Sequence, residues 1–377
     1  MLCNTSIELV CQLQTYSPSE EQKILLKDLN YWLNGVIGGS IAVTGLLMNM
    51  ITIIILRSMP EWKYMMNFLL SFLMITNNIF LVTQVIDILF YNFGVKELLI
   101  IIPNFVYPLE KTTLTMAVFC TISLAHQAYI ITWNNKNHKL RLESIHVQRL
   151  RYVFPIIITS VLVNLPRWFS YELRSVKVQN LSFRSEKIKT SLKTSFYYIV
   201  YYENCVLNIL TVFVPITLLV FFNWSVYNFI QEKQREIEKA FSIAKDVIAK
   251  RSKEKDKSKD KKKSDSRKKA STKILIIIIV IFIVCHFPRC ILKFSDGFPK
   301  HIIIKMMDSI GRVLLITYSS ATPFIYLTTN TRFRDHFYNL LNKIFCCRRE
   351  KLREIENLSS TSTGNQPRSV KSNQSKY

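Results

Sequence analysis

The stretch LNGVIGGSIAVTGLLMNMITIIIL, residues 33–56, contains 24 residues without one charged side chain. An α-helix rises about 1.5 Å per residue, so a helix of this length exceeds the roughly 30 Å hydrocarbon core of a bilayer. Because charged groups are costly in that core, an uncharged run this long predicts a membrane-spanning helix. The chain is therefore expected to be a membrane protein.

Six further apolar runs follow, separated by polar segments. They cover residues 66–90, 103–133, 152–170, 197–230, 273–294 and 302–328. Together with the first run they predict an all-α fold, a bundle of seven transmembrane helices. The seventh run is the weakest, because Lys305, Asp308 and Arg312 precede its uncharged part, and a hydropathy window is expected to miss it.

The composition argues against several classes of protein. The chain has 377 residues, a formal net charge of +24 and 49% hydrophobic residues, so charged and apolar residues must be segregated. It has no Gly-rich phosphate loop, no HExxH and no CxxC, which argues against nucleotide-dependent enzymes and against a zinc or haem site. We expect no enzymatic activity, no cofactor, no metal and no nucleic-acid partner. Cys3 and Cys11 are placed for an extracellular disulfide, although pairing is left open.

The distribution of Lys and Arg predicts the orientation. With the N-terminus outside, most cations fall on cytoplasmic segments, chiefly because of the basic loop at residues 231–272 and the C-terminal tail. Residues 1–32 are then an extracellular N-terminus without a cleavable signal peptide. The glycosylation sequons at Asn4 and Asn180 fall outside in this topology. We expect a multi-pass protein of the plasma membrane.

The segment after the seventh run has an amphipathic pattern. Residues 332–345 are expected to form an interfacial helix that ends at Cys346 and Cys347. Juxtamembrane cysteines of this kind suit palmitoylation, although they could equally remain free. Residues 346–377 are Ser-, Thr- and Asn-rich and are expected to be a disordered cytoplasmic tail.

Polar residues and prolines interrupt the apolar runs. Asn49 and Asn77 should face the bundle and hydrogen-bond to each other or to the seventh helix, since an unsatisfied amide is costly in lipid. Pro288 and Pro323 should each remove a backbone hydrogen bond and kink their helix. The two amides have either a packing role or a switching role.

Short motifs stand in a fixed order along residues 33–345. They are Asn49; Asn67-Phe68-Leu69-Leu70 before Asn77; Tyr107-Pro108-Leu109; Asn164-Leu165-Pro166-Arg167-Trp168-Phe169; Pro215 and Asn223; Cys285-His286-Phe287-Pro288-Arg289; and Thr322-Pro323-Phe324-Ile325-Tyr326 before Phe333-Arg334. In this order the chain resembles the rhodopsin-like (class A) G-protein-coupled receptors, and within them the FMRFamide-like neuropeptide receptors of invertebrates. The resemblance implies an extracellular ligand, an amidated neuropeptide, and a heterotrimeric G protein engaged by outward movement of helix six.

The same resemblance implies which residues switch or couple. They are Asn49, Asn77, His126, Gln127, Pro215, Phe282, Pro288, Pro323 and Tyr326. The chain also departs from the family pattern. Asn77 replaces a carboxylate that binds sodium, and His126-Gln127-Ala128 replaces Asp/Glu-Arg-Tyr. No Cys occurs in residues 171–196, so the usual extracellular disulfide cannot form, and a diverged or reduced coupling mechanism is expected.

Ionisable residues in the predicted outer halves of the spans are the candidate ligand contacts, because such residues usually face the bundle interior or a water-filled cavity. They are Asp87, Glu110, Glu172, Glu203, His286, Arg289, Asp308 and Arg312. A cavity of mixed charge with an aromatic rim suits a peptide, and Glu110 or Asp87 would pair an arginine of such a ligand. The alternative is that these residues form internal salt bridges that only hold the helices together.

Alternative functions remain. The chain could be a ligand-binding seven-helix protein with weak or no G-protein coupling, or a membrane transporter or channel, although inverted repeats are not found. A light sensor is disfavoured because the seventh run has no lysine beyond Lys305, whereas retinal needs a buried one. The Lys-rich part of the 231–272 loop suits contact with anionic lipid, and a solvated linker is as good an interpretation.

Overall fold

The computed structural model describes most of the chain between residues 19 and 342. The described residues are 19–59, 65–93, 102–133, 145–178, 182–248, 277, 278, 280–288, 302–329, 331 and 333–342. The chain divides into two compact units, Met1–Asn330 and Thr331–Tyr377. The second unit contains a short helix at residues 333–342, inside the range predicted for the amphipathic helix.

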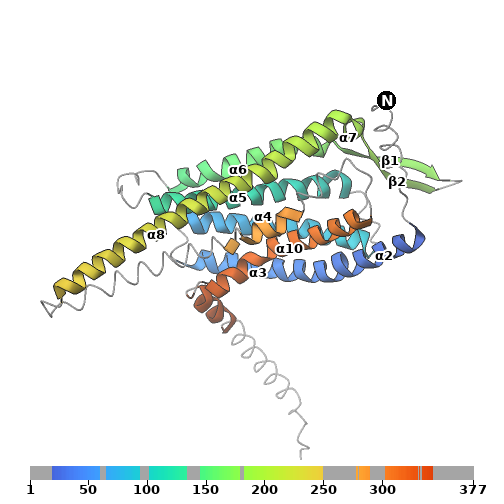
Figure 1. Cartoon of the computed structure of the whole chain (residues 1–377). Coiled ribbons are helices and arrows are strands. Elements are labelled where there is room, and N and C mark those ends of the chain that lie inside the picture. The colour runs from blue at the N-terminus through green and yellow to red at the C-terminus, as the bar shows by residue number, and fades with distance from the viewer. Residues whose placement is uncertain are drawn as a thin grey trace, which may run out of the picture. The chain divides into compact units, whose positions relative to one another are not determined.

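The first unit is built mainly from long helices (Figure 1). Their bounds are α2 Glu20–Asn30, η1 Tyr31–Gly38, α3 Gly39–Ser58, α4 Met65–Tyr91, η4 Ile102–Val106, α5 Tyr107–Trp133, α6 Ile145–Trp168, α7 Ser191–Thr194, η6 Tyr198–Val206, η7 Ile209–Phe213, α8 Val214–Ile248 and α10 Ile302–Thr329. A further helical stretch lies at residues 280–288. The segments named η are π-helical turns that run directly into α3, α5 and α8 or lie just before them.

Five of the helices are long and apolar enough to cross a membrane, which supports a multi-pass helical membrane protein. They are Glu20–Ser58, Met65–Tyr91, Asn104–Ile131, His146–Trp168 and Tyr198–Phe229. The helix α10, with 28 residues, is not among them, as expected from the three charged residues in its first half. Seven membrane spans therefore stay a prediction.

The first long helix begins well before the predicted span. Ser19 caps α2: its hydroxyl accepts a hydrogen bond from the Gln22 backbone, and the Gln22 side chain accepts one from the Ser19 backbone. Glu20 and Glu21 in the first turn add a favourable interaction with the positive end of the helix dipole. The polar residues that were expected only as an extracellular segment thus extend the helix by about three turns.

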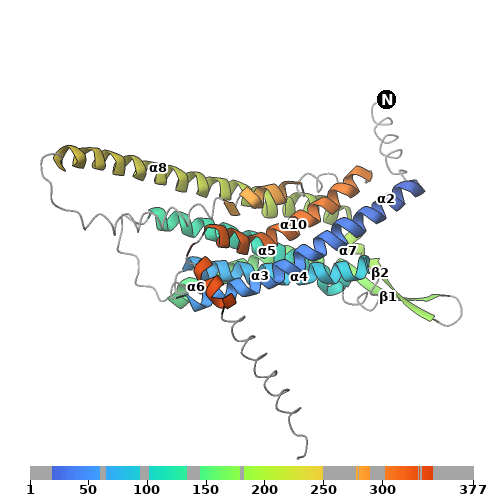
Figure 2. The same cartoon turned by 90° about the horizontal axis from the view of Figure 1, so that it is seen from below.

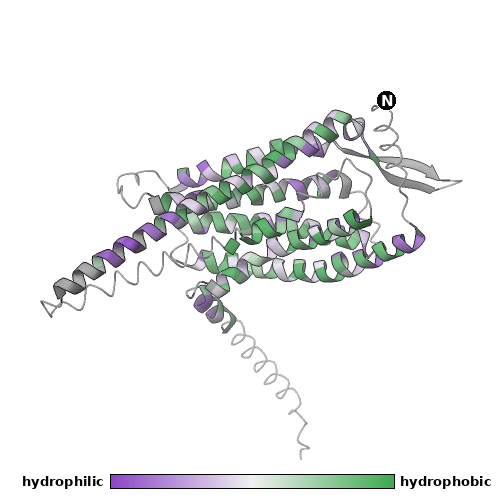
Figure 3. Ribbon diagram, in the orientation of Figure 1, coloured by the Kyte–Doolittle hydropathy of each residue, from purple (hydrophilic) through white to green (hydrophobic). Residues whose placement is uncertain are grey.

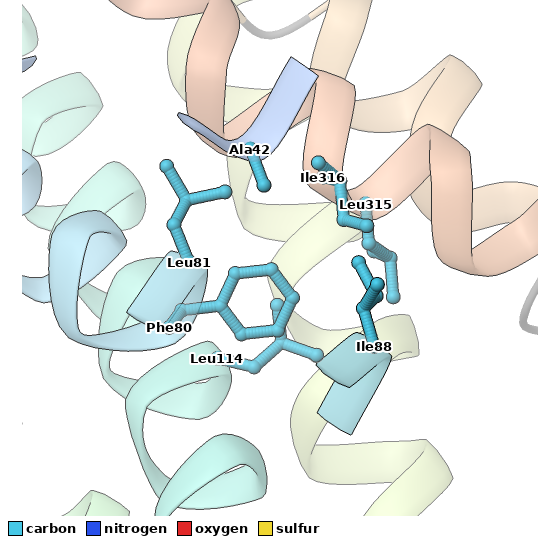
Figure 4. Packing of buried hydrophobic residues seen from close by; sticks show 7 residues of the cluster. All are labelled: Ala42, Phe80, Leu81, Ile88, Leu114, Leu315 and Ile316. Carbon is cyan, nitrogen blue, oxygen red and sulfur yellow. The ribbon is translucent and has the colours of Figure 1, made fainter. Parts of the chain in front are cut away.

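The helix α4 lies at the centre of the bundle. It contacts α3, α5, α6 and α10, and α5 in turn contacts α6 and α8. Within the apolar window of α4, 61% of the residues are buried, against 17% in α6. Figure 4 shows the packed core that joins α3, α4, α5 and α10. Its buried members are Ala42, Phe80, Leu81, Ile88, Leu114, Leu315 and Ile316.

The remaining faces of the helices expose large apolar side chains. On α6 these include Leu150 and Leu162, and on α8 Phe221 and Trp224, which are all at least 55% exposed. Apolar patches of this extent mark contact with lipid or another apolar surface. Figure 3 shows that the apolar character of α8 gives way to hydrophilic residues along its far part, in agreement with an extension beyond the lipid.

A β-hairpin interrupts the all-α architecture, and the sequence analysis did not predict it. The strand β1, Tyr171–Val178, pairs antiparallel with β2, Ser182–Lys189, in a register that sets Tyr171 opposite Lys189. In Figures 1 and 2 the hairpin lies at the same end of the bundle as α2 and α7. We call this end the hairpin end, and the end at which α5 stops and α6 begins the opposite end.

Candidate ligand site and switch region

Four helical segments meet around a small cavity in the hairpin half of the bundle. Its volume is about 20 Å³, room for about one water molecule. The polar residues that line it are Lys111 and Thr115 of α5, Arg167 of α6, Thr211 of η7, and His286 of the helix at residues 280–288. Apolar residues of α5 and η7 complete the wall. Of the predicted ligand residues, the cavity therefore contains His286.

Arg167 is the most unusual side chain of this cavity. It lies within the apolar window of α6 and is only 6% exposed. Its Nη1 donates to Asn164 Oδ1 at 2.8 Å, whereas its Nε has no hydrogen-bond partner among the residues that the structure describes. A buried guanidinium without a carboxylate carries a desolvation cost that a single amide hydrogen bond does not offset.

Asn164 links Arg167 to the neighbouring helix. Its Nδ2 donates to Thr115 Oγ1 at 3.0 Å and to the Ser160 carbonyl at 2.9 Å. The amide is fully buried. Because both sides of the Asn164 amide are engaged, the network fixes Arg167 against α5 and turns the guanidinium to the cavity.

The second cation of the cavity is neutralised. Lys111 forms an ion pair with the adjacent Glu110, and its ammonium lies 5.3 Å from the ring centroid of Tyr107. The Glu110 carboxylate is therefore already paired with a cation of the protein, which favours the internal salt-bridge interpretation for this residue. The net charge next to the cavity is left positive by Arg167.

Three predicted ligand residues form a separate cluster. Arg312 of α10 lies 3.8 Å from Asp87 of α4 and 3.3 Å from Asp308, one turn away on its own helix. The arginine is 51% exposed, so water weakens both ion pairs. This cluster joins α4 to α10 at the hairpin end and also fits the internal salt-bridge interpretation.

The acidic residues near the hairpin are placed differently. Glu203 of η6 is paired with Lys193 of α7 at 2.5 Å. Glu172 of β1 is exposed. Burial, and next the negative charge of Glu203, raise the pKa of the neighbouring Tyr171. Arg289 lies outside the described residues.

An aromatic stack connects the cavity with the interior. The rings of His286 and Phe282 are stacked, 4.2 Å apart, and both meet the Tyr318 ring edge-on. The Tyr318 hydroxyl lies 2.8 Å from Thr121 Oγ1 of α5. A group that enters the cavity would therefore touch a contiguous path from the helix at residues 280–288 to α10 and α5.

The two predicted buried amides, Asn49 and Asn77, differ in their hydrogen bonding. Asn49 donates from Nδ2 to the Ser319 carbonyl of α10 at 3.1 Å, which confirms the predicted bond to the seventh helix. Asn77 is completely buried, as expected for a residue that faces the bundle. Neither amide atom of Asn77, however, has a partner among the described residues. Its predicted bond to Asn49 or to the seventh helix is therefore not formed in this part of the chain.

The predicted prolines all lie in helical segments, and one of them directly follows a π-helical turn. Pro323 is inside α10, three residues before Tyr326. Pro215 is the second residue of α8, directly after the π-helical turn η7. Pro288 is the last described residue of its helix. Single π turns and prolines both weaken the regular hydrogen-bond ladder, so the predicted helix bending is expected at these positions.

His126 occupies the opposite end of α5. The hydroxyl of Tyr152, on α6, lies 3.3 Å from its Nδ1, and the Phe222 ring of α8 is 5.3 Å away. Gln127 beside it is half-buried. Where the resemblance would place an acid and an arginine, the chain thus has an aromatic junction of three helices.

Several predicted sites lie outside the described residues. They are Asn4, Asn180, Arg289, Cys346, Cys347, the pair Cys3 and Cys11, and the Lys-rich stretch within residues 251–272. In the described part, no three His, Cys, Asp or Glu side chains are grouped to hold a metal ion.

The sequence analysis missed Arg167 as a site residue. Arg167 was quoted only as part of a motif, although a cation in an apolar run is itself a signal for function. Comparison with known proteins adds no identification. No protein-family model and no curated protein matches the chain.

Proposed function

We propose that the chain is a cell-surface receptor for an extracellular ligand, an amidated neuropeptide, and that it signals through a heterotrimeric G protein. In this proposal the hairpin end is extracellular and the membrane is the plasma membrane. The observation that carries the proposal is the buried Arg167, which faces a small cavity without a carboxylate of its own. Buried ionisable groups within membrane helices usually serve a function.

The chemistry of the cavity agrees with the end group of an amidated peptide. The Nε of Arg167 is a donor without a protein acceptor among the described residues, and a peptide carbonyl or terminal amide oxygen would accept from it. The cavity has room for only one water-sized group, so the ligand would place a small polar end there and its larger part toward the hairpin. Glu110, next to Lys111, would exchange partners to bind a basic ligand side chain.

The route to the opposite end passes through the aromatic stack. A ligand group against His286 would favour one arrangement of the Phe282 and Tyr318 rings over another. The ligand shifts the equilibrium between the two arrangements only if it binds one of them more tightly than the other. Outward movement of the helix at residues 280–288 then opens the opposite end to the G protein. Because His126 and Gln127 stand at that end, we infer a coupling contact that differs from the family pattern.

The test is a screen of amidated peptides on cells that express the chain, with binding and second-messenger signals measured in parallel. We expect a saturable, peptide-dependent signal that Arg167→Gln weakens at least about ten-fold, the loss of one charge-assisted hydrogen bond in a buried site. Arg57→Gln, at an exposed residue in the last turn of α3 that does not line the cavity, is the matched control for binding and should leave peptide affinity unchanged.

Other results would favour the alternatives. Saturable binding without any second-messenger change would identify a ligand-binding protein with weak or no G-protein coupling. Ion current or solute uptake in the absence of saturable peptide binding would instead indicate a transporter or channel. An amidated peptide that binds Arg167→Gln as well as the native chain would remove Arg167 from the site.

A further inference from the structure

A second and larger cavity lies on the lipid-facing surface between α5, α6 and α8. Its volume is about 260 Å³, and it is open on one side. Apolar side chains from all three helices form most of its wall, among them Phe119 and Ile122 of α5, Ile156 of α6, and Val214 and Leu218 of α8. This lipid groove lies outside the ligand site and shares no residue with it.

One end of the lipid groove carries a cation. Arg151, Pro155 and Thr159 line it at intervals of four residues, so they lie on one face of α6. At about 1.5 Å per residue, Arg151 and Thr159 are about 12 Å apart along the helix axis. Arg151 is exposed and stands six residues after the start of α6, at the depth where a long cationic side chain reaches the lipid headgroups.

The stretches of the three helices that line the lipid groove carry positive charge. No Asp or Glu occurs in residues 111–133 of α5, in residues 145–168 of α6, or in residues 214–231 of α8. A second cation at this end, Arg149, lies with its guanidinium 4.6 Å from the Phe68 ring of α4. Along these stretches the three helices therefore present an apolar channel that ends at positive charge.

We propose that the lipid groove binds one acyl chain of an anionic glycerophospholipid, whose phosphate group contacts Arg151. The apolar wall accommodates the chain, and the positive end selects the headgroup. Basic pockets between membrane helices bind anionic headgroups in this manner. The hydroxyl group of Thr159, farther along the groove, donates to the Pro155 carbonyl of its own helix and leaves the wall there apolar.

Native mass spectrometry of the full chain in detergent tests the proposal. The probes are phosphatidylglycerol and phosphatidylcholine with identical palmitoyl and oleoyl chains. We expect phosphatidylglycerol to be retained about five-fold more than phosphatidylcholine, the ratio that one cation near a charged lipid supports. Arg151→Gln should remove this preference while phosphatidylcholine retention stays unchanged.

Two further variants separate the groove from general surface charge. Arg57→Gln removes an exposed cation of α3 that does not line the groove, and it should keep the preference. Leu218→Trp should fill the groove and lower the retention of both lipids. Equal retention of the two lipids by the native chain would overturn the proposal, as would a loss in Arg57→Gln as large as in Arg151→Gln. If Leu218→Trp does not fold, Leu218→Phe provides the same test with a smaller side chain.

Discussion

The two cavities of the bundle show how burial changes the meaning of one residue type. Arg167 is 6% exposed, faces a small cavity and has no acidic partner among the described residues. Arg151 is exposed at the end of an open groove. Charge in the interior must be compensated by another group, whereas charge at the headgroup depth is solvated or meets lipid phosphate. A positive charge is thus costly at the buried Arg167 and ordinary at the exposed Arg151.

The contact of α3 with α10 is tightly packed at Gly45. A Cβ atom at Gly45 would collide with Ser320 Oγ and lie 2.5 Å from Ser320 Cβ and 3.1 Å from its Cα. Moving the Ser320 side chain does not relieve the contact with the backbone. The contact between α3 and α10 therefore leaves no room for a methyl group at Gly45.

The largest predicted effect is at this section. We expect Gly45→Ala to destabilise the protein by about 3 kcal/mol, because α3 and α10 must separate to admit the methyl group. The midpoint of thermal unfolding in detergent measures it. Gly39→Ala is the control: its Cβ would lie 3.9 Å from Ile88, an ordinary contact, so stability should stay the same or rise slightly. Equal midpoints for both variants would mean that α3 and α10 are not in close contact.

The second prediction compares the two arginines directly. Arg167→Gln removes a buried charge and keeps an amide donor for Asn164, so we expect it to raise the free energy of unfolding by about 1 kcal/mol or more. Arg151→Gln, at an exposed site, should change it by less than about 0.5 kcal/mol. Thermal unfolding of both variants without ligand gives the comparison. If Arg167→Gln is clearly less stable than the native chain, Arg167 holds the helices together and the difference between the two cavities disappears.

The sequence was sufficient for the helices whose signal is local. A long, largely apolar run marks a helix by itself, and the expected ranges 66–90 and 302–328 agree with α4 and α10 to within one residue at each end. Nothing equally local marks the π-helical turns. Whether residues 209–213 form a π turn depends on packing around the cavity, so the sequence predicted only a continuous helix there.

The site was harder to predict because its residues are distant in sequence. Lys111, Arg167, Thr211 and His286 come from four segments, and their meeting point depends on the helix arrangement. The sequence identified His286 from its place in a motif. Asp87 and Arg312 pair with each other. The sequence could not distinguish such paired residues from residues that face a cavity, because both are ionisable groups at similar positions along the predicted helices.

The third prediction concerns the stack that adjoins the ligand site. Tyr318→Phe keeps the rings of Phe282 and His286 in contact with an aromatic ring and removes the hydroxyl near Thr121. Thr121 retains its bond to the Ala117 carbonyl, so we expect a loss of only about 1 kcal/mol in stability. If the stack transmits the ligand signal, the maximal response should fall while peptide affinity stays the same. A loss of affinity equal to the loss of response would place Tyr318 in the binding site instead.

The smallest predicted effect lies at the exposed edge of the hairpin half, where Arg312 meets Asp87 and Asp308. Asp87→Asn removes a contact of 3.8 Å, and the arginine, 51% exposed, retains Asp308 on its own helix. Exposed pairs of this kind contribute about 0 to 1 kcal/mol, so the unfolding midpoint should shift little and added salt should reduce even that shift. Asp308→Asn is the matched change within the same cluster. If Asp87→Asn lowered stability as much as is expected for Gly45→Ala, the ion pair of Asp87 with Arg312 would have to be shielded from water. Buried charge would then not be confined to the surroundings of Arg167.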